Sequence, residues 1–197
     1  MENLQDDTAR RIIEMATPLF ADKGYAGVSV REIIQATGIG NVGAISYYFG
    51  GKRELYLAIL REHFKNAHRL ADVINQRESS PVKKLELIFA AIGETYQTSP
   101  YTIKLLFTEI NQPSEFFAEI DAEVKGIQQV SRDIIQAGID DKIFRADADP
   151  ESMTLVLFSI AHFVFIMPNF ARNLLAGKTF DEYLKQAQEI FFRGIMR

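Results

Sequence analysis

Apolar residues recur at spacings of three and four along almost the whole chain, which is the pattern of amphipathic helices. The first such segment spans residues 8–23, and Gly24 is a suitable C-terminal stop. No segment shows the alternating pattern of a strand. The sequence therefore predicts an all-α protein of about nine helices. The apolar positions of the first helix are Ile12, Ile13, Ala16, Leu19 and Phe20.

Capping signals divide this pattern into separate helices. Ser29 with Glu32, and Thr179 with Glu182, have the capping-box form and predict helices over residues 29–37 and 179–197.

Prolines mark further helix boundaries. Pro81, Pro100 and Pro150 are each expected in the first turn of a helix, where the missing N–H of proline has no partner to lose. Pro168 should kink or split the helix in which it lies. The helices expected from these signals are residues 52–76, one starting at Pro81, one at Pro100, one that follows Pro113 and ends around Gly138, and residues 149–176.

Two short helices joined by a tight, glycine-bearing turn lie between residues 29 and 52, which predicts a helix-turn-helix. The first ends near Gly38, and Asn41 is a good N-cap for the second, expected over residues 41–48. The small first turn of the second helix would let it approach base edges in the major groove. The pattern alone also fits a three-helix packing unit without DNA binding.

Charge supports DNA binding only weakly. The net charge is −4, but residues 8–53 carry six basic and three acidic residues, giving +3. Residues 1–7 carry −3 and residues 54–197 carry −4. A mildly basic head on an acidic body suits a protein that touches phosphates at one end.

The absence of cysteine excludes disulfides, thiolate metal sites and a cysteine nucleophile, and is compatible with a reducing compartment. The N-terminal segment has no apolar stretch of signal-peptide length. The most apolar stretch, residues 153–167, is interrupted by polar side chains and stops at Pro168, short of the roughly 20 residues that cross a bilayer. We therefore expect a cytoplasmic protein without a membrane partner.

A helical enzyme is the alternative from another class, and it would need a nucleophile–base pair or a carboxylate pair in a cleft. The sequence has neither a G-x-S-x-G nor an H-E-x-x-H string. The adjacent acids Asp140 and Asp141 indicate a solvated turn. His63 and His68 are five residues apart, which is not the i, i+4 spacing of a helical metal site. We expect no enzyme activity, no cofactor and no metal.

Residues 12–60 resemble the N-terminal domain of the TetR family of regulators, most specifically in the strings LFADKGY, SVREI and YYFGGKRELY. The resemblance implies a DNA-binding domain over residues 1–52 and an effector-binding and dimerisation domain over residues 53–197. It also assigns DNA contacts to individual positions. These are Ser29, Arg31, Asn41, Val42, Gly43, Ala44, Tyr47, Tyr48 and Lys52.

Two positions depart from the family pattern. Gly40 lengthens the turn by one residue, and Ser46 stands where the family most often has tyrosine. Both changes bear on the base contacts more than on the phosphate contacts.

The resemblance further implies a homodimer formed by the last two helices, which would place two heads on a palindromic double-stranded operator. The alternative is that these apolar residues form only the core of one chain. The expected interface residues are Leu155, Phe158, Tyr183, Ile190 and Phe191.

A small-molecule effector, bound in an apolar cavity of the body, would release a repressor from DNA. His162 is the most distinctive candidate, although a lone histidine on an apolar helix is more often part of the core. A body that docks a protein instead of a ligand is the second possibility. The expected lining residues are Tyr101, Phe107, His162, Phe163 and Met167.

Overall fold

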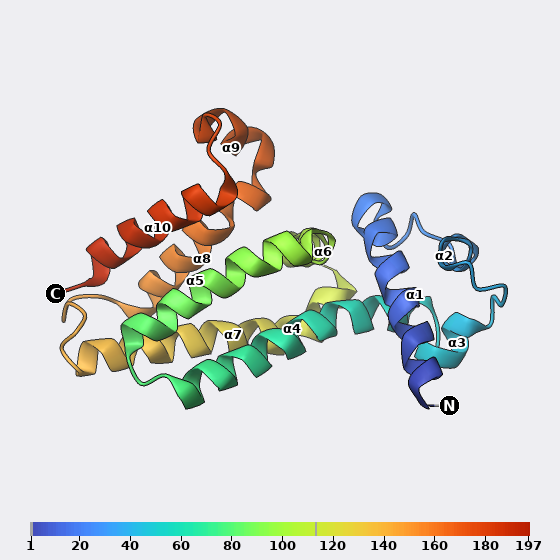
Figure 1. The fold of residues 1–197 in the computed structure, drawn as a ribbon, viewed down its shortest axis with the longest axis horizontal. Coiled ribbons are helices and arrows are strands. Elements are labelled where there is room, and N and C mark those ends of the chain that lie inside the picture. Colours follow the sequence, from blue (N-terminus) through green and yellow to red (C-terminus); the bar gives the residue numbers. More distant parts are fainter. Residues whose placement is uncertain (1, 113) are drawn as a thin grey trace. The chain divides into compact units, whose positions relative to one another are not determined.

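The computed structural model describes residues 2–112 and 114–197, with side chains from residue 7 onward, and it confirms the all-α prediction. The described residues form ten helices and no strand; Phe144 and Met196 make one isolated bridge (Figure 1). The helices are α1 (Glu2–Lys23), α2 (Val30–Thr37), α3 (Ala44–Phe49), α4 (Lys52–Arg77), α5 (Pro81–Thr98), α6 (Pro100–Asn111), α7 (Glu115–Asp140), α8 (Pro150–Ile166), α9 (Pro168–Leu175) and α10 (Phe180–Ile195).

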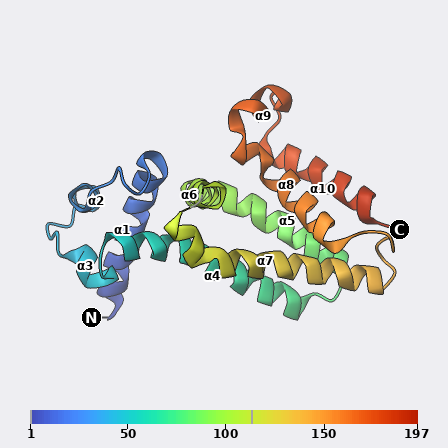
Figure 2. The ribbon, with the colours of Figure 1, turned by 180° about the vertical axis from the view of Figure 1, so that it is seen from behind.

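The chain packs as two compact units that do not follow the order of the sequence. Unit 1 contains Met1–Lys65 and Ser99–Asp121, and unit 2 contains Asn66–Thr98 and Ala122–Arg197. Figure 2 shows the helices of each unit from behind. The long helices α4 and α7 each contribute residues to both units. The expected boundary after residue 52 separates a DNA-binding domain from an effector-binding and dimerisation domain. This functional division stays a prediction.

The predicted break at Pro168 is confirmed, and it accounts for the tenth helix. Because proline lacks an N–H and clashes with the preceding turn, α8 ends at Ile166 and α9 starts at Pro168. The two helices meet at an angle of 95°. Both predicted capping boxes are also present: the hydroxyls of Ser29 and Thr179 each accept a hydrogen bond from the third residue of their helix.

The core of unit 2 is built from the inward faces of α5, α7, α8 and α10. Aliphatic residues dominate, and Phe89 packs edge-on against Phe191 with ring centroids 5.7 Å apart. The fully or nearly fully buried members are Leu85, Phe89, Ile134, Ile135, Phe144, Leu157, Ala161, Leu184, Phe191 and Ile195.

No single helix in the described chain is both long and apolar enough to span a membrane. The bent pair α8 and α9 meets those criteria only when its two members are taken together.

Gly138 provides a test of packing in this core. A Cβ at this position would overlap the ring of the buried Phe144, whose N–H also donates a 2.9 Å hydrogen bond to the Gly138 carbonyl. We expect Gly138→Ala to lower the free energy of unfolding by about 1–3 kcal/mol, as overpacked cores do. Urea denaturation measures this change.

Gly194, in α10, is the matched control. Its Cβ position is open, so Gly194→Ala should leave the free energy of unfolding unchanged or raise it by up to about 1 kcal/mol. Equal effects of the two substitutions would contradict the predicted clash at Phe144.

Candidate DNA-binding surface

Helix α2 is fixed at both ends by its own sequence. The Ser29 hydroxyl accepts a hydrogen bond from the Glu32 N–H at 3.2 Å, and the Glu32 carboxylate accepts one from the Ser29 N–H at 3.4 Å. Glu32 also pairs with Lys23 at the end of α1. These bonds hold the pKa of Glu32 below its usual value. The buried side chains Ile33, Ile34 and Thr37 fix the inner face of α2, while Arg31 is exposed.

The turn after α2 is set by Gly38, which caps the helix in the left-handed conformation at φ 68°. This conformation favours glycine because it has no Cβ. Gly40 has open space around its Cβ position, so the additional residue of this turn is accommodated without a close contact.

The expected start of the second helix at Asn41 is wrong. Helix α3 spans Ala44–Phe49, with Gly43 as its N-cap. The Asn41 side chain accepts a 2.9 Å hydrogen bond from the Gly43 N–H, and its carbonyl accepts one from Ala44. The side-chain oxygen of Asn41, which was expected to cap the second helix, accepts a hydrogen bond within a local turn instead. Residues 41–43 therefore form a tight turn before α3.

The residues expected to contact DNA differ in their exposure. Tyr47 is 70% exposed and Val42 50%, whereas Ala44 is only 5% exposed and packs with the core of the head. Tyr48 is half-buried, and its ring meets that of Tyr47 edge-on at 4.9 Å. The outward surface of this segment also includes Ser29, Arg31, Asn41 and Gly43.

Lys52 begins α4, as expected, and lies directly after two glycines with positive φ, Gly50 and Gly51. Its ammonium lies 4.1 Å from the centroid of the Tyr25 ring, a cation–π geometry. Partial burial lowers the pKa of Lys52. The N-terminus of α4, where Lys52 lies, favours a nearby anion such as a DNA phosphate. The phosphate contact expected for Lys52 stays a prediction.

The structure adds a second group of residues to unit 1 that the sequence reasoning missed. Tyr56, 1% exposed, donates a 2.5 Å hydrogen bond to the carboxylate of Glu109 on α6, which is 7% exposed. The Ser114 hydroxyl donates to the other carboxylate oxygen. Burial is the largest cause that raises the pKa of Tyr56, and the hydrogen bond to Glu109 is the second. A lone glutamate within the apolar run of α6 was the signal that could have indicated this buried pair.

Ion pairs and rings attach α6 and the start of α7 to the other helices of unit 1. Lys104 pairs with Asp22 at 2.9 Å, and Glu119 pairs with Arg53 at 2.9 Å and with Arg61 at 2.8 Å. The Phe116 ring meets those of Tyr25 and Tyr56, each at 4.7 Å between centroids.

The residues expected to line an effector cavity fall in both units. Tyr101 and Phe107 lie on α6 in unit 1, and His162, Phe163 and Met167 lie in unit 2. His162 Nδ1 is 2.7 Å from the hydroxyl of Tyr96, whose pKa is raised by burial. Phe163 and Met167 are exposed. Their role in binding an effector stays a prediction.

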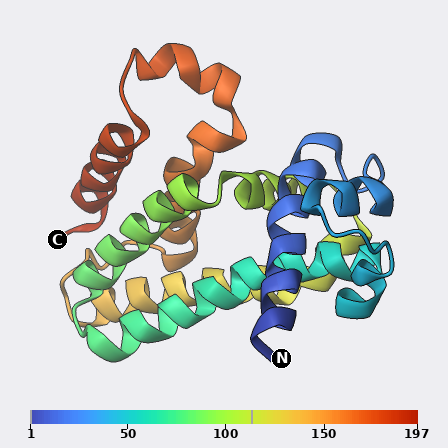
Figure 3. The same cartoon turned by 45° about the vertical axis from the view of Figure 1, so that its right-hand side comes forward.

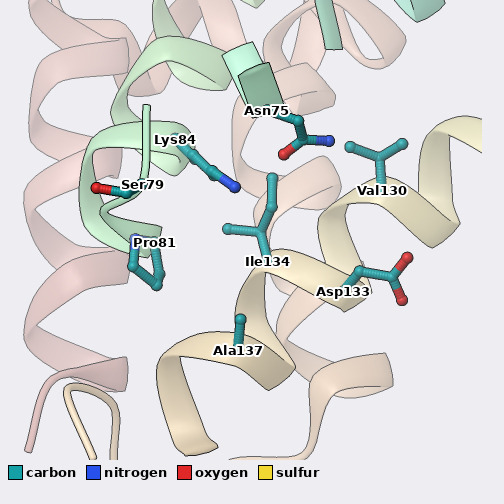
Figure 4. A pocket seen from close by; sticks show the side chains of 8 residues that line it. All are labelled: Asn75, Ser79, Pro81, Lys84, Val130, Asp133, Ile134 and Ala137. Carbon is teal, nitrogen blue, oxygen red and sulfur yellow. The ribbon is translucent and has the colours of Figure 1, made fainter. Parts of the chain in front are cut away.

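A small hollow in unit 2 lies elsewhere, between the end of α4, the start of α5 and α7 (Figure 4). Its volume of about 140 Å³ is below the roughly 300 Å³ at which pockets for drug-sized ligands begin. None of the expected effector residues lines it. The lining residues are Asn75, Ser79, Pro81, Lys84, Val130, Asp133, Ile134 and Ala137.

The residues expected at a dimer interface also differ in their exposure. Leu155 and Ile190 are each 68% exposed, whereas Phe191 is 3% exposed and belongs to the core of its own unit. Phe158 and Tyr183 are half-buried, and the Tyr183 hydroxyl donates a 2.5 Å hydrogen bond to the Ile160 carbonyl.

No group of three or more histidine, aspartate or glutamate side chains in the described part of the chain is arranged to hold a metal ion.

An α2–turn–α3 unit held against α1, with arginine and tyrosine side chains facing outward, defines a helix-turn-helix DNA-binding protein. Residues 12–59 match the family described as bacterial regulatory proteins, tetR family. This match covers α2, α3 and the parts of α1 and α4 next to them, so the DNA-binding head is similar to that of TetR-family transcription regulators.

Similar proteins extend this match along the chain. The HTH-type transcriptional repressor NicS of Pseudomonas putida is 24% identical over 203 residues, which cover 98% of this chain and 94% of NicS. The HTH-type transcriptional repressor KstR2 of Mycolicibacterium smegmatis is 26% identical over 140 residues, covering 70% of this chain and 68% of KstR2.

Among solved structures, the transcriptional regulator FadR from Bacillus subtilis, in complex with stearoyl-CoA, shares the fold with a TM-score of 0.77. It is 18% identical, and the match covers 94% of this chain and 98% of FadR.

Proposed function

We propose that this chain is a homodimeric transcription repressor whose two heads bind a palindromic operator, and that a small-molecule effector in the C-terminal body releases it from DNA. The observation that carries the proposal is the capped α2–turn–α3 unit with Arg31 and Tyr47 on its outer surface. Such a unit places its second helix in the major groove. The similarity to NicS and KstR2, both named as repressors, supports repression.

The proposed DNA contacts are a subset of those expected from the sequence. Arg31, Tyr47 and Val42 are exposed and suited to base edges and phosphates. Ser29, Tyr48 and Lys52 are proposed to position the phosphate backbone. Ala44 is left out of the contact surface because its side chain is buried.

Dimerisation is proposed through the exposed apolar residues of α8 and α10, chiefly Leu155 and Ile190. Two copies are needed because one head spans only one half-site. Phe191 is left out because it packs inside its own unit.

Effector control requires a change in the body to alter the head. The packing of unit 1 supports such a link, because Ser99–Asp121 belongs to the body in sequence but packs with the head. An effector that shifts α6 would therefore act directly on the unit that binds DNA. By thermodynamic linkage, binding of operator DNA would lower the affinity of the protein for the effector by the same factor.

Fluorescence anisotropy with a labelled DNA fragment from upstream of the chain's own gene tests the proposal. We expect saturation at two chains per operator. Acyl-CoA thioesters are the first effectors to test, because FadR holds stearoyl-CoA. A true effector should raise the dissociation constant for DNA by about 5- to 150-fold.

Native mass spectrometry of freshly purified protein provides the second measurement. A co-purified small molecule would support effector control. An empty body, together with DNA binding that no small molecule alters, would favour a body that docks a protein partner. Failure to bind any genomic fragment in genome-wide mapping would contradict the proposal as a whole.

A further inference from the structure

The hollow between the end of α4, the start of α5 and α7 has an apolar floor. Ile134, 4% exposed, is part of the core of unit 2, and Val130 and Ala137 lie one turn to either side of it on α7. Pro81, the first residue of α5, adds an apolar wall. The segments that carry these residues all belong to unit 2 and meet at one end of it (Figures 1 and 3).

One cation points into this apolar hollow. In Figure 4 the side chain of Lys84 extends from α5, and its ammonium ends between Asn75 and Ile134. The preceding residue, Lys83, is exposed and pairs with Glu86 at 2.6 Å. Lys84, by contrast, is half-buried and forms no ion pair with any residue that the structure describes. Because a partly buried ammonium is stabilised by an acceptor that it can bind, the hollow favours an anionic ligand.

Among the described residues that line the hollow, only Asp133 is acidic, and it does not neutralise Lys84. In Figure 4 its carboxylate lies on the far side of Ile134 from the lysine and turns away from it. The side chain of Asp133 is exposed and accepts a 2.6 Å hydrogen bond from the Gln129 amide. The ammonium of Lys84 is therefore open to an anion from outside the chain.

The volume of the hollow limits the size of this anion. Its volume of about 140 Å³ is roughly five times the volume of one water molecule in the liquid, so it suits a ligand of about five to eight non-hydrogen atoms. A short-chain aliphatic carboxylate such as isobutyrate has this size. Its charge matches Lys84, and its chain matches the apolar floor. Inorganic phosphate has no apolar part and would leave that floor uncovered.

We propose that this hollow binds a short-chain aliphatic monocarboxylate, with the carboxylate on Lys84 and the aliphatic chain on Ile134. The Asn75 amide lines the same hollow and can donate a hydrogen bond to the second carboxylate oxygen. The site is separate from the effector cavity expected from the sequence, because none of the residues expected there lines it. A ligand bound here contacts α4, α5 and α7 together, so binding should raise the temperature of unfolding.

Saturation-transfer NMR of the full chain with isobutyrate tests the proposal. We expect a dissociation constant of about 1 mM, as suits a ligand of this size. Lys84→Gln should lower the affinity at least about tenfold, because it removes a hydrogen bond between two charged groups. Lys83→Gln, which changes the exposed neighbour, is the matched control and should bind as the wild type does. Isobutyramide has the same shape without the charge and should show no binding.

Two further substitutions test the place of the site and the charge of its ligand. Ala137→Leu enlarges an exposed side chain that lines the hollow and should abolish binding. Ala90→Leu, at an exposed alanine of α5 away from the lining, is its control and should have no effect. Asp133→Asn should raise the affinity for isobutyrate by about twofold to fivefold, since it removes a like charge from the rim.

The outcomes distinguish this ligand from its alternatives. Equal binding of isobutyrate by the wild type and Lys84→Gln would overturn the proposal, as would equal binding of isobutyramide and isobutyrate. Binding of inorganic phosphate without binding of isobutyrate would exclude a role for the apolar floor and also overturn it. If L-valine bound, isobutyrate did not, and Asp133→Asn abolished the valine signal, the site would be one for a zwitterion instead. All these measurements use the protein without DNA, so a negative result leaves the proposed repressor function standing.

Discussion

Replacing Arg31 and Tyr47 together with alanine should lower the affinity for operator DNA by about 100-fold or more. Each side chain is exposed on the α2–turn–α3 unit, where a good contact with a base or phosphate contributes about 1–3 kcal/mol. A 100-fold loss of affinity corresponds to about 2.7 kcal/mol, which lies within the roughly 2–6 kcal/mol expected for the loss of two such contacts. Anisotropy titrations at one fixed salt concentration measure the change, because affinity for DNA depends steeply on salt.

The fold should be unaffected, since neither side chain is part of the buried core of the head. Arg69→Ala, which removes an exposed arginine from the unit 2 part of α4, is the control and should bind DNA as the wild type does. Unchanged DNA affinity in the Arg31 and Tyr47 double variant, with normal thermal unfolding, would show that the recognition surface lies elsewhere.

Tyr56→Ala should produce the largest loss of stability of any single substitution considered. The ring is 1% exposed and packs against Phe20 at 4.9 Å and Phe116 at 4.7 Å between centroids. Truncating a buried aromatic residue costs about 3–5 kcal/mol, through lost burial and the cavity that remains. Urea unfolding followed by circular dichroism measures the loss.

Tyr56→Phe separates the hydrogen bond from the packing. It keeps the ring but removes the donor to Glu109, a buried carboxylate that also accepts a hydrogen bond from the Ser114 hydroxyl. Removing a donor from a buried acceptor costs about 1–3 kcal/mol, so this variant should lie between the wild type and Tyr56→Ala. Equal stability of Tyr56→Phe and the wild type would mean that the bond contributes nothing to the fold.

Local signals in the sequence were sufficient to predict most helix boundaries. Ser29 with Glu32 and Thr179 with Glu182 form capping boxes. A capping box depends on only a few neighbouring residues, so both could be predicted from the sequence, and the structure confirms them. Pro168 split its helix for an equally local reason. The prediction that Asn41 caps the second helix was wrong because an asparagine side chain can accept a hydrogen bond either in a helix cap or in a short turn. In the structure it accepts one from the Gly43 N–H in a turn, and α3 starts at Ala44.

The candidate DNA-binding surface was predictable as a segment but less so residue by residue. The motif strings located residues 29–52, yet a sequence does not show which side of a short helix packs inward. Ala44 and Tyr47 illustrate this, because only packing against the rest of the head made one buried and the other exposed. The same limit applies to Phe191 and Ile190, adjacent residues on α10 that face the core and the outside respectively.

By itself, the sequence determined the helix-turn-helix, the caps of its first helix and the helical nature of the chain, since periodicity, caps and prolines act over a few residues. Only the tertiary structure decided which distant segments share a unit. Ser99–Asp121 packs with the head because Glu109, Lys104 and Glu119 find partners 53, 82 and 66 residues away in sequence, at Tyr56, Asp22 and Arg53. Such pairings depend on the path of the whole chain, and no local pattern encodes them.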